Sequence, residues 1–150
     1  MIDLFFSCQT GSGKVSLDTK SDMCTIILFY KMFDDSPVIV ASNRDEFYSR
    51  KSSSPGVLAR EPLVLGGQDL EAGGTWMGVN QRGLWVGIAN RLSDTQIGPE
   101  RRSRGLLCMD LLSKSSCEDA LPDLRKIPEG RYNPFYLIVA DKKERIFCGL

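Results

Sequence analysis

Apolar residues between positions 24 and 43 fall into two short runs, each of strand length. The runs are CTIILFYK at 24–31 and PVIVASN at 37–43, and both are rich in β-branched and aromatic residues. The segment MFDDS between them contains residues that favour turns. We therefore predict a β-hairpin over residues 24–43. Because both runs are almost continuously apolar, we expect its strands to be covered on both faces.

Three further segments show the strand pattern. PLVLGG at 62–67 predicts a short strand, and TWMGVNQRGLWVGIANR at 75–91 predicts two strands joined by a tight turn at 80–83. Gly83 stands where that turn requires a positive φ. FYLIVAD, KKE and RIFCGL, which together span 135–150, predict a third hairpin whose last strand runs to the end of the sequence.

The segment between the second and third hairpins has a helical pattern instead. SRGLLCMDLLS at 103–113 places its leucines and its methionine on one broad face of a helix. Ser116 and Asp119 suit the cap of a second, short helix, which we expect Pro122 to limit. Hairpins followed by helices and a last hairpin favour the α+β class over a doubly wound parallel sheet.

Length and composition fit one globular domain, at 23–150, after a polar segment at 1–22 that we predict to be a loose leader. No apolar run approaches the roughly eighteen residues of a membrane span, so we expect a soluble protein. The 19 basic and 19 acidic residues give a net charge of zero. The basic residues are scattered except for ERRSR at 100–104, so we expect no nucleic-acid partner.

The numbers and spacing of cysteine and histidine limit which catalytic and metal sites this chain can form. The five cysteines include no C-x-x-C pair, which favours reduced thiols in a cytoplasmic protein over a disulfide framework or a zinc knuckle. They are Cys8, Cys24, Cys108, Cys117 and Cys148. Histidine is absent, which excludes Ser-His-Asp and Cys-His catalysis and imidazole ligation of zinc or haem within this chain. We expect no bound metal and no cofactor.

Cys24 is the main candidate for catalysis. If it were the first residue of the working protein, its free α-amino group, with a reference pKa of about 7.7–8.0, could take the proton of its own thiol. Met23 before a small residue is an initiator methionine of the kind that can be trimmed. The alternative is that Cys24 is a small apolar residue at the start of a buried strand, which is the commoner situation for a cysteine.

Polar residues at the ends of two predicted strands could complete a site with Cys24. Arg44 and Asp45, in the NRDE segment at 43–46, should lie beside Cys24 because the hairpin brings the two strand ends together. Arg44 could favour the thiolate, and Asp45 could hold the α-ammonium group. A structural ion pair is an equally good explanation. Asn90 ends the strand GLWVGIAN and could stabilise an oxyanion, or simply form a turn.

These motifs resemble those of the NRDE family, also called the Transport and Golgi Organisation two family. The resemblance spans 23–150 and rests on MCTIILF, ASNRDEFYSR, GGTWMGVNQRGLWVGIANR and YNPFYLIVADKKE. It implies a four-layer αββα sandwich similar to that of N-terminal-nucleophile hydrolases, of which this chain corresponds to the N-terminal half. A more distant likeness to conjugated bile acid hydrolases implies a catalytic set of Cys24, Arg44, Asp45 and Asn90.

The resemblance implies a cysteine amidohydrolase that cleaves a linear amide or acyl bond of a small molecule through a thioester on Cys24. Asn43, Glu46 and Trp76 are the substrate-binding candidates, although core packing is the commoner role of a strand tryptophan. The residues before Cys24 would have to be removed, or translation would have to start at Met23. The alternative is a trafficking or carrier factor for Golgi organisation, lipid or haem, in which Cys24 is a ligand or a core residue.

Overall fold

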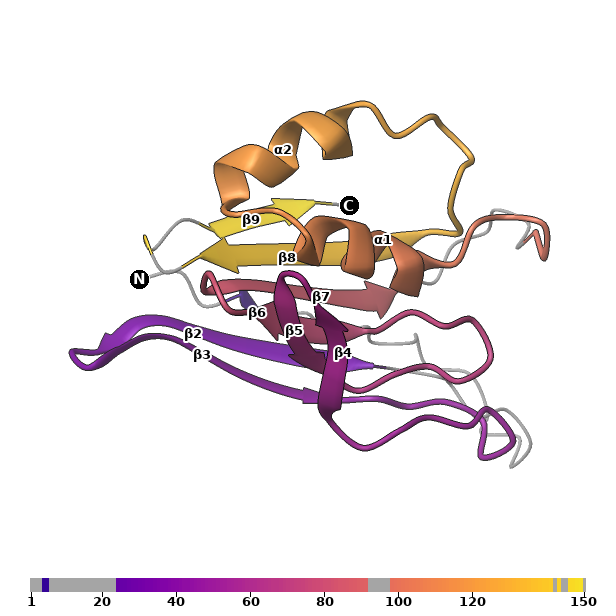
Figure 1. Cartoon of the computed structure of the whole chain (residues 1–150), viewed down its shortest axis with the longest axis horizontal. Helices are drawn as coiled ribbons and strands as arrows, with labels where there is room; N and C mark the ends of the chain where they lie inside the picture. Colours follow the sequence, from indigo (N-terminus) through magenta and orange to yellow (C-terminus); the bar gives the residue numbers. More distant parts are fainter. Residues whose placement is uncertain (1–3, 6–23, 92–97, 142, 144–145, 150) are drawn as a thin grey trace, which may run out of the picture.

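The structure is a computed structural model. It describes residues 4–5, 24–91, 98–141, 143 and 146–149. These residues form three layers: two helices lie on one face of a six-stranded sheet, and a three-stranded sheet lies on its other face (Figure 1). The α+β class predicted from the sequence is confirmed. No helix in the described ranges has the length and apolarity needed to cross a membrane.

The three-stranded sheet, with order β1-β2-β3, is built on the first predicted hairpin. Its strands are β1 (Leu4–Phe5), β2 (Thr25–Phe33) and β3 (Ser36–Asn43), all antiparallel. The hairpin is confirmed, but its turn is shorter than expected because pairing extends to Phe33 and Ser36. Near the turn the register shifts, and Lys31 adopts a φ of 53°. Residues 1–3 and 6–23 of the predicted leader lie outside the described residues.

Coverage of this hairpin on both faces was expected, and that expectation is wrong for the described residues. On β2, Ile26 and Leu28 are buried, whereas Met32 and Phe33 are more than half exposed. On β3, Ile39 is exposed as well. The burial therefore alternates along the strands, as in a sheet with one covered face. The apolar runs did not reveal this because β-branched and aromatic residues also suit the exposed face of a strand.

The six-stranded sheet is an antiparallel meander in which each strand pairs with the next along the chain. Its strands are β4 (Gly56–Arg60), β5 (Leu63–Gly66), β6 (Met77–Asn80), β7 (Leu84–Asn90), β8 (Phe135–Asp141) and β9 (Ile146–Gly149). The strands predicted within 62–67, 75–91 and 135–150 are confirmed, whereas β4 was not predicted. Gly83 has a φ of 82°, as expected, and its N–H donates to Asn80 O at 2.9 Å.

Both predicted helices are present, with serine caps. α1 (Arg104–Leu112) begins after Ser103, whose hydroxyl oxygen accepts from Gly105 N at 3.2 Å. α2 (Cys117–Arg125) begins after Ser116, whose hydroxyl oxygen accepts from Asp119 N, also at 3.2 Å. The prediction that Pro122 limits the second helix is wrong, because the helix continues to Arg125. A proline removes one helical N–H bond, and the buried Cys117 and Ala120 still hold this helix against the sheet.

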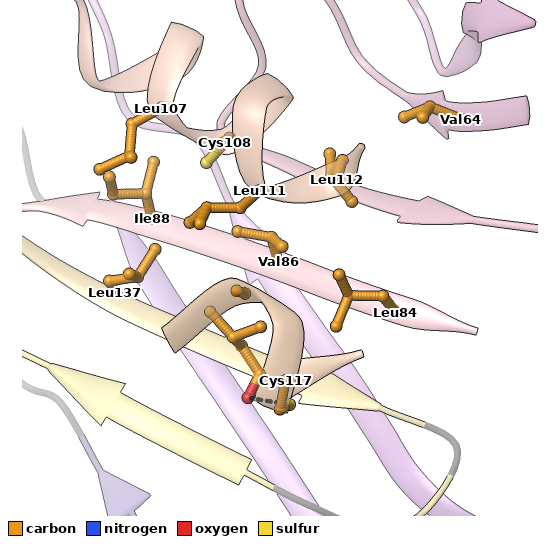
Figure 2. Packing of buried hydrophobic residues seen from close by; sticks show 12 residues of the cluster. Val64, Leu84, Val86, Ile88, Leu107, Cys108, Leu111, Leu112, Cys117 and Leu137 are labelled. Atoms are coloured by element: carbon orange, nitrogen blue, oxygen red, sulfur yellow. Dashed lines mark hydrogen bonds between the residues drawn. The ribbon is translucent and has the colours of Figure 1, made fainter. Parts of the chain in front are cut away.

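Two apolar clusters hold the layers together. The larger one lies between the helices and the six-stranded sheet, where Leu107 and Leu111 of α1 meet Val86 and Ile88 of β7 (Figure 2). Leu111 is fully buried, and burial of one such side chain contributes about 1.5–3 kcal/mol. The smaller cluster joins the two sheets through Ile26, Leu28, Ala89 and Ile138. This smaller cluster holds the start of β2, and with it Cys24, beside the end of β7.

Candidate active site

The first hairpin places Cys24 and the NRDE segment at the same end of the three-stranded sheet. Thr25 at the start of β2 pairs with Asn43 at the end of β3, so Cys24, just before β2, and Arg44, just after β3, are neighbours beyond this pair. The Asn43 side chain closes the strand end, because its Oδ1 accepts from Thr25 N at 2.7 Å. The thiol of Cys24 donates to the backbone oxygen of Asp45 at 3.6 Å. The sequence-based expectation that these residues are neighbours is therefore met by the geometry, whereas their roles stay predictions.

A cavity of about 300 Å³ opens at this strand end. Five of the seven residues singled out in the sequence line it: Cys24, Arg44, Glu46, Trp76 and Asn90. The ends of β2, β3 and β7 thus meet at one cavity, to which each contributes a polar or nucleophilic side chain.

Asn43 and Asp45 are not among the residues that line the cavity. Their side chains contact each other, since Asn43 Nδ2 donates to Asp45 Oδ2 at 3.3 Å. This contact, together with the bond from Asn43 to Thr25 N, fixes the strand ends behind Cys24. Asn43 therefore supports the strand ends of the site, and its role in substrate binding stays a prediction.

Arg44 is held between two carboxylates and a tryptophan. Its Nη2 lies 3.8 Å from Glu46 Oε2 and 3.7 Å from Asp69 Oδ2. Its guanidinium carbon lies 5.0 Å from the centroid of the Trp76 ring, which is within the range of a cation–π contact. Nη2 is buried and makes no hydrogen bond within the described ranges. Arg44 therefore has a fixed position beside the cavity and retains an unused hydrogen-bond donor.

Burial raises the pKa of the Cys24 thiol above its ordinary value. The hydrogen bond to Asp45 O lowers this pKa and the charge of Glu46 raises it further. The charge of Arg44 also lowers the pKa, but its effect is smaller than that of burial. Arg44 thus acts in the direction expected from the sequence, but it is too weak to make Cys24 a stable thiolate. Ionisation of this thiol at neutral pH needs a base close to the sulfur.

Asp69 organises one wall of the cavity and was not predicted from the sequence. Its Oδ2 accepts from Arg50 Nε at 2.8 Å, and its Oδ1 accepts from the backbone N–H groups of Glu71 and Ala72 at 3.0 and 3.2 Å. Burial would raise the pKa of this carboxyl, but the bonds from Arg50 and from the two backbone groups outweigh burial and lower it. Asp69 is therefore an ionised anchor for the arginines of this wall.

Another part of the cavity lining is the start of α1, which contacts the glycine pair of the GGTW motif. A Cβ atom on Gly74 would lie 2.2 Å from the backbone carbon of Gly105, so only glycine permits this approach. Thr75 N donates to Gly105 O at 3.1 Å, and Thr75 is fully buried. This packing fixes Ser103 and Arg104 at the rim, where both line the cavity.

Sequence reasoning missed most of the charge in the site. Arg50, Asp69, Arg101, Arg102 and Arg104 all line the cavity. For Arg101, Arg102 and Arg104 the only signal was the tight basic group at 100–104, and a group of this kind bears on nucleic-acid binding and does not indicate a cavity. For Arg50 and Asp69 no pattern pointed to the site, because they reach it through loops. Within the described ranges, no group of three or more histidine, cysteine or acidic residues could hold a metal ion.

Comparison with known proteins supports the resemblance seen in the sequence. Residues 23–148 match the family described as Transport and Golgi organisation 2. The Transport and Golgi organization 2 homolog of Mus musculus is 40% identical over 131 residues, which cover 79% of this chain and 45% of the mouse protein. The Homo sapiens homolog matches with the same identity and coverage.

The Bos taurus homolog is 38% identical over 141 residues, which cover 84% of this chain and 49% of the bovine protein. The chain spans about half the length of the curated relatives it matches. The matched region contains the NRDE segment, the GGTW motif and Asn90. Because the match extends over most of the sequence, the chain belongs to the Transport and Golgi organisation 2 family.

Proposed function

We propose that this chain carries the nucleophile of a cysteine amidohydrolase of the N-terminal-nucleophile type, which cleaves a linear amide or related acyl bond. One observation carries the proposal: Cys24 lies at the start of β2 in a cavity that Arg44 and Asn90 also line. A nucleophile, a cation and a side-chain amide at one cavity are the groups that acyl transfer requires.

The α-amino group of Cys24 is the base in this proposal. The thiol has a raised pKa and histidine is absent from the chain, so we assign the role of base to the nitrogen of the same residue. In the printed sequence this nitrogen forms a peptide bond with Met23. The working enzyme therefore begins at Cys24, either after removal of the preceding residues or after translation from Met23 and loss of that methionine.

Acylation follows from this arrangement. The amine takes the proton of Sγ, and the thiolate attacks the carbonyl carbon of the substrate to form a C–S bond. The side-chain amide of Asn90 donates to the oxyanion, while Arg44 adds positive charge nearby. When the intermediate collapses, the C–N bond breaks and the leaving amine takes the proton from the α-ammonium group.

Deacylation uses the same groups. The free α-amine takes a proton from a water molecule, whose oxygen attacks the thioester carbonyl. The C–S bond then breaks, the acid leaves, and Sγ recovers its proton. Trp76 and Glu46 bind the substrate beside the nucleophile.

We further propose the four-layer αββα sandwich for the whole protein, with the three described layers as its N-terminal portion.

The first test is the mature N-terminus of the purified protein, read by intact mass. The proposal expects a chain that begins at Cys24, and a working protein that retains residue 23 would refute it. The second test is labelling by an electrophilic amide probe. Labelling should be lost in Cys24→Ala, and it should remain in the control Cys117→Ser, which changes a thiol in the helix-covered core. Equal labelling of Cys24→Ala and the unchanged protein would also contradict the proposal.

A carrier or trafficking role is the second candidate. The observation that favours it is the raised pKa of Cys24, because a thiol held neutral by burial is a poor nucleophile unless its α-amine is free. The relatives are named for transport and Golgi organization, which also suits this reading. Here Cys24→Ala leaves function intact. A Soret band on addition of haem, lost in Cys24→Ala, would instead indicate a thiolate ligand.

A further inference from the structure

The cavity beside Cys24 has more positive than negative side chains. Among the described residues that line it, five are arginines and two are acidic, Glu46 and Asp69. Arg44 and Arg50 share these two carboxylates. The remaining three arginines, at 101, 102 and 104, therefore depend on other partners.

Arg102 has its own carboxylate. Its guanidinium contacts Asp110 through Nη1 and Nη2, and Nη1 also donates to the Tyr132 hydroxyl at 2.6 Å. Asp110 is not among the residues that line the cavity. The charge of Arg102 is thus neutralised outside the cavity, and this side chain is engaged in holding α1 to the 131–135 segment.

Arg101 and Arg104 have no carboxylate partner within the described ranges. Arg101 Nη1 donates to Tyr132 O at 3.3 Å, and Arg104 Nη1 donates to Pro134 O at 2.8 Å. A guanidinium has five N–H donors, so each group keeps several that these backbone oxygens do not use. Both side chains line the same cavity.

Burial disfavours the charged form of Arg104 more strongly than its neighbours favour it. Its pKa is lowered first by burial and then by the nearby charge of Arg50, while Cys24 and Glu46 act in the opposite direction. A half-buried cation of this kind is stabilised when an anion enters its site. Cys24 and Arg104 line the same cavity, and the effect of Cys24 on the pKa of Arg104 agrees with this proximity.

The position of Arg104 is fixed by the backbone. Arg104 is the first residue of α1, next to Gly105, whose carbonyl oxygen accepts from Thr75 N. The close approach of Gly74 to Gly105 leaves no room for the helix start to move toward the sheet. A preformed cation at a cavity wall binds an oxyanion without a large ordering cost.

We propose that Arg101 and Arg104 bind an anionic group of the substrate, a carboxylate or a phosphate, while its acyl part lies against Trp76 and Ile88 near Cys24. This inference rests on the proposed function for the identity of the reacting bond, and it defines the substrate class as an acyl compound with an acidic group. A volume of about 300 Å³ is at the lower limit for small-molecule sites, so the portion enclosed is short.

The test is protection of Cys24 against alkylation by neutral iodoacetamide, followed by peptide mass spectrometry of the full chain. The competitors are hexanoate, hexyl phosphate, inorganic phosphate and the neutral control hexanamide. We expect the two alkyl anions to slow alkylation at concentrations where hexanamide does not. Stronger protection by one anion assigns the group as carboxylate or phosphate, and equal protection by inorganic phosphate supports a site for the free ion. Hexanamide protecting as well as hexanoate would overturn the proposal.

Variants connect the effect to the two arginines. Arg104→Gln should raise the concentration of hexanoate needed for half-protection about tenfold, and Arg104→Lys should restore part of it. Arg60→Gln, a charge-matched control at an exposed position of β4, should change nothing. Thermal unfolding is measured for each variant. If Arg104→Gln unfolds, Arg101→Gln decides the question, and unchanged protection in a folded variant refutes the site.

Protection requires neither turnover nor a free α-amine at residue 24. Failure of the amidohydrolase proposal therefore leaves the anion site testable. Conversely, a chain that begins at Cys24 and reacts with amide probes, yet shows no preference for anions, would retain the proposed function and remove this inference.

Discussion

Asn80 and Asn90 lie at the two ends of one motif, N-x-x-G-L-x-V-G-x-x-N, and the structure gives them different environments. Asn80 is only 4% exposed, whereas Asn90 is exposed at the cavity. We predict that Asn80→Ala destabilises the protein strongly and that Asn90→Ala does not. Under the proposed function, Asn90→Ala should instead reduce turnover.

The magnitude for Asn80 follows from its four hydrogen bonds. Nδ2 donates to Leu112 O at 2.8 Å and to Lys114 O at 2.7 Å, which joins the hairpin to the end of α1. Oδ1 accepts from Arg82 N at 2.9 Å and from Leu84 N at 3.1 Å. At about 0.5–1.5 kcal/mol for each bond, and with buried partners left unpaired, we expect a loss of about 3 kcal/mol.

Urea denaturation and thermal unfolding measure this loss. A decrease of about 3 kcal/mol corresponds to a Tm lower by about 6–12 °C for a domain of this size, with an unchanged dependence on urea. The side chain of Asn90 makes no hydrogen bond within the described ranges, although its backbone pairs with Phe135, so its variant should remain within about 0.5 kcal/mol of the unchanged protein. Equal losses in the two variants would show that the assignment of a structural and a cavity asparagine is mistaken.

Three further predictions concern the same site. With Met23 attached, Cys24 should react with iodoacetamide more slowly at pH 8 than a cysteine peptide does, because burial raises the pKa of its thiol. The alkylation rate should still increase above pH 9, and a plateau below pH 8 would contradict this prediction. Asp69→Asn should lower the free energy of unfolding by about 1–3 kcal/mol at pH 7. Because the pKa of Asp69 is lowered, this difference should shrink as the pH falls below about 4, and a difference independent of pH from 7 to 2 would exclude the ionised anchor. Gly74→Ala should cost more than about 2 kcal/mol through its clash with Gly105, whereas Gly56→Ala, where a Cβ has space, should cost little; circular dichroism melts compare them.

The elements with strong local patterns could be predicted from the sequence. The hairpin at 24–43, the turn at Gly83 and the serine cap of the second helix depend on neighbouring residues, so their signals are local. The α+β class followed from the order of these elements. The proximity of Cys24 and Arg44 was also predictable, because a hairpin brings the two ends of adjacent strands together.

Other features depended on contacts between segments that are distant in the sequence. The exposed face of the first hairpin, the continuation of α2 past Pro122 and the wall formed by Asp69 could not be read from local patterns. Arg101 and Arg104 looked like part of an ordinary basic surface group. The packing of Gly74 against Gly105 places the start of α1, and with it Arg104, at the cavity of Cys24, which Arg101 also lines.

The sequence by itself therefore determined most of the strands, both helices, the nucleophile candidate and the family. The tertiary structure decided which charges are neutralised and which face the cavity. The physical reason is that secondary structure depends on residues a few positions apart, whereas burial and electrostatic interactions depend on distance in space, which the packed layers alone establish.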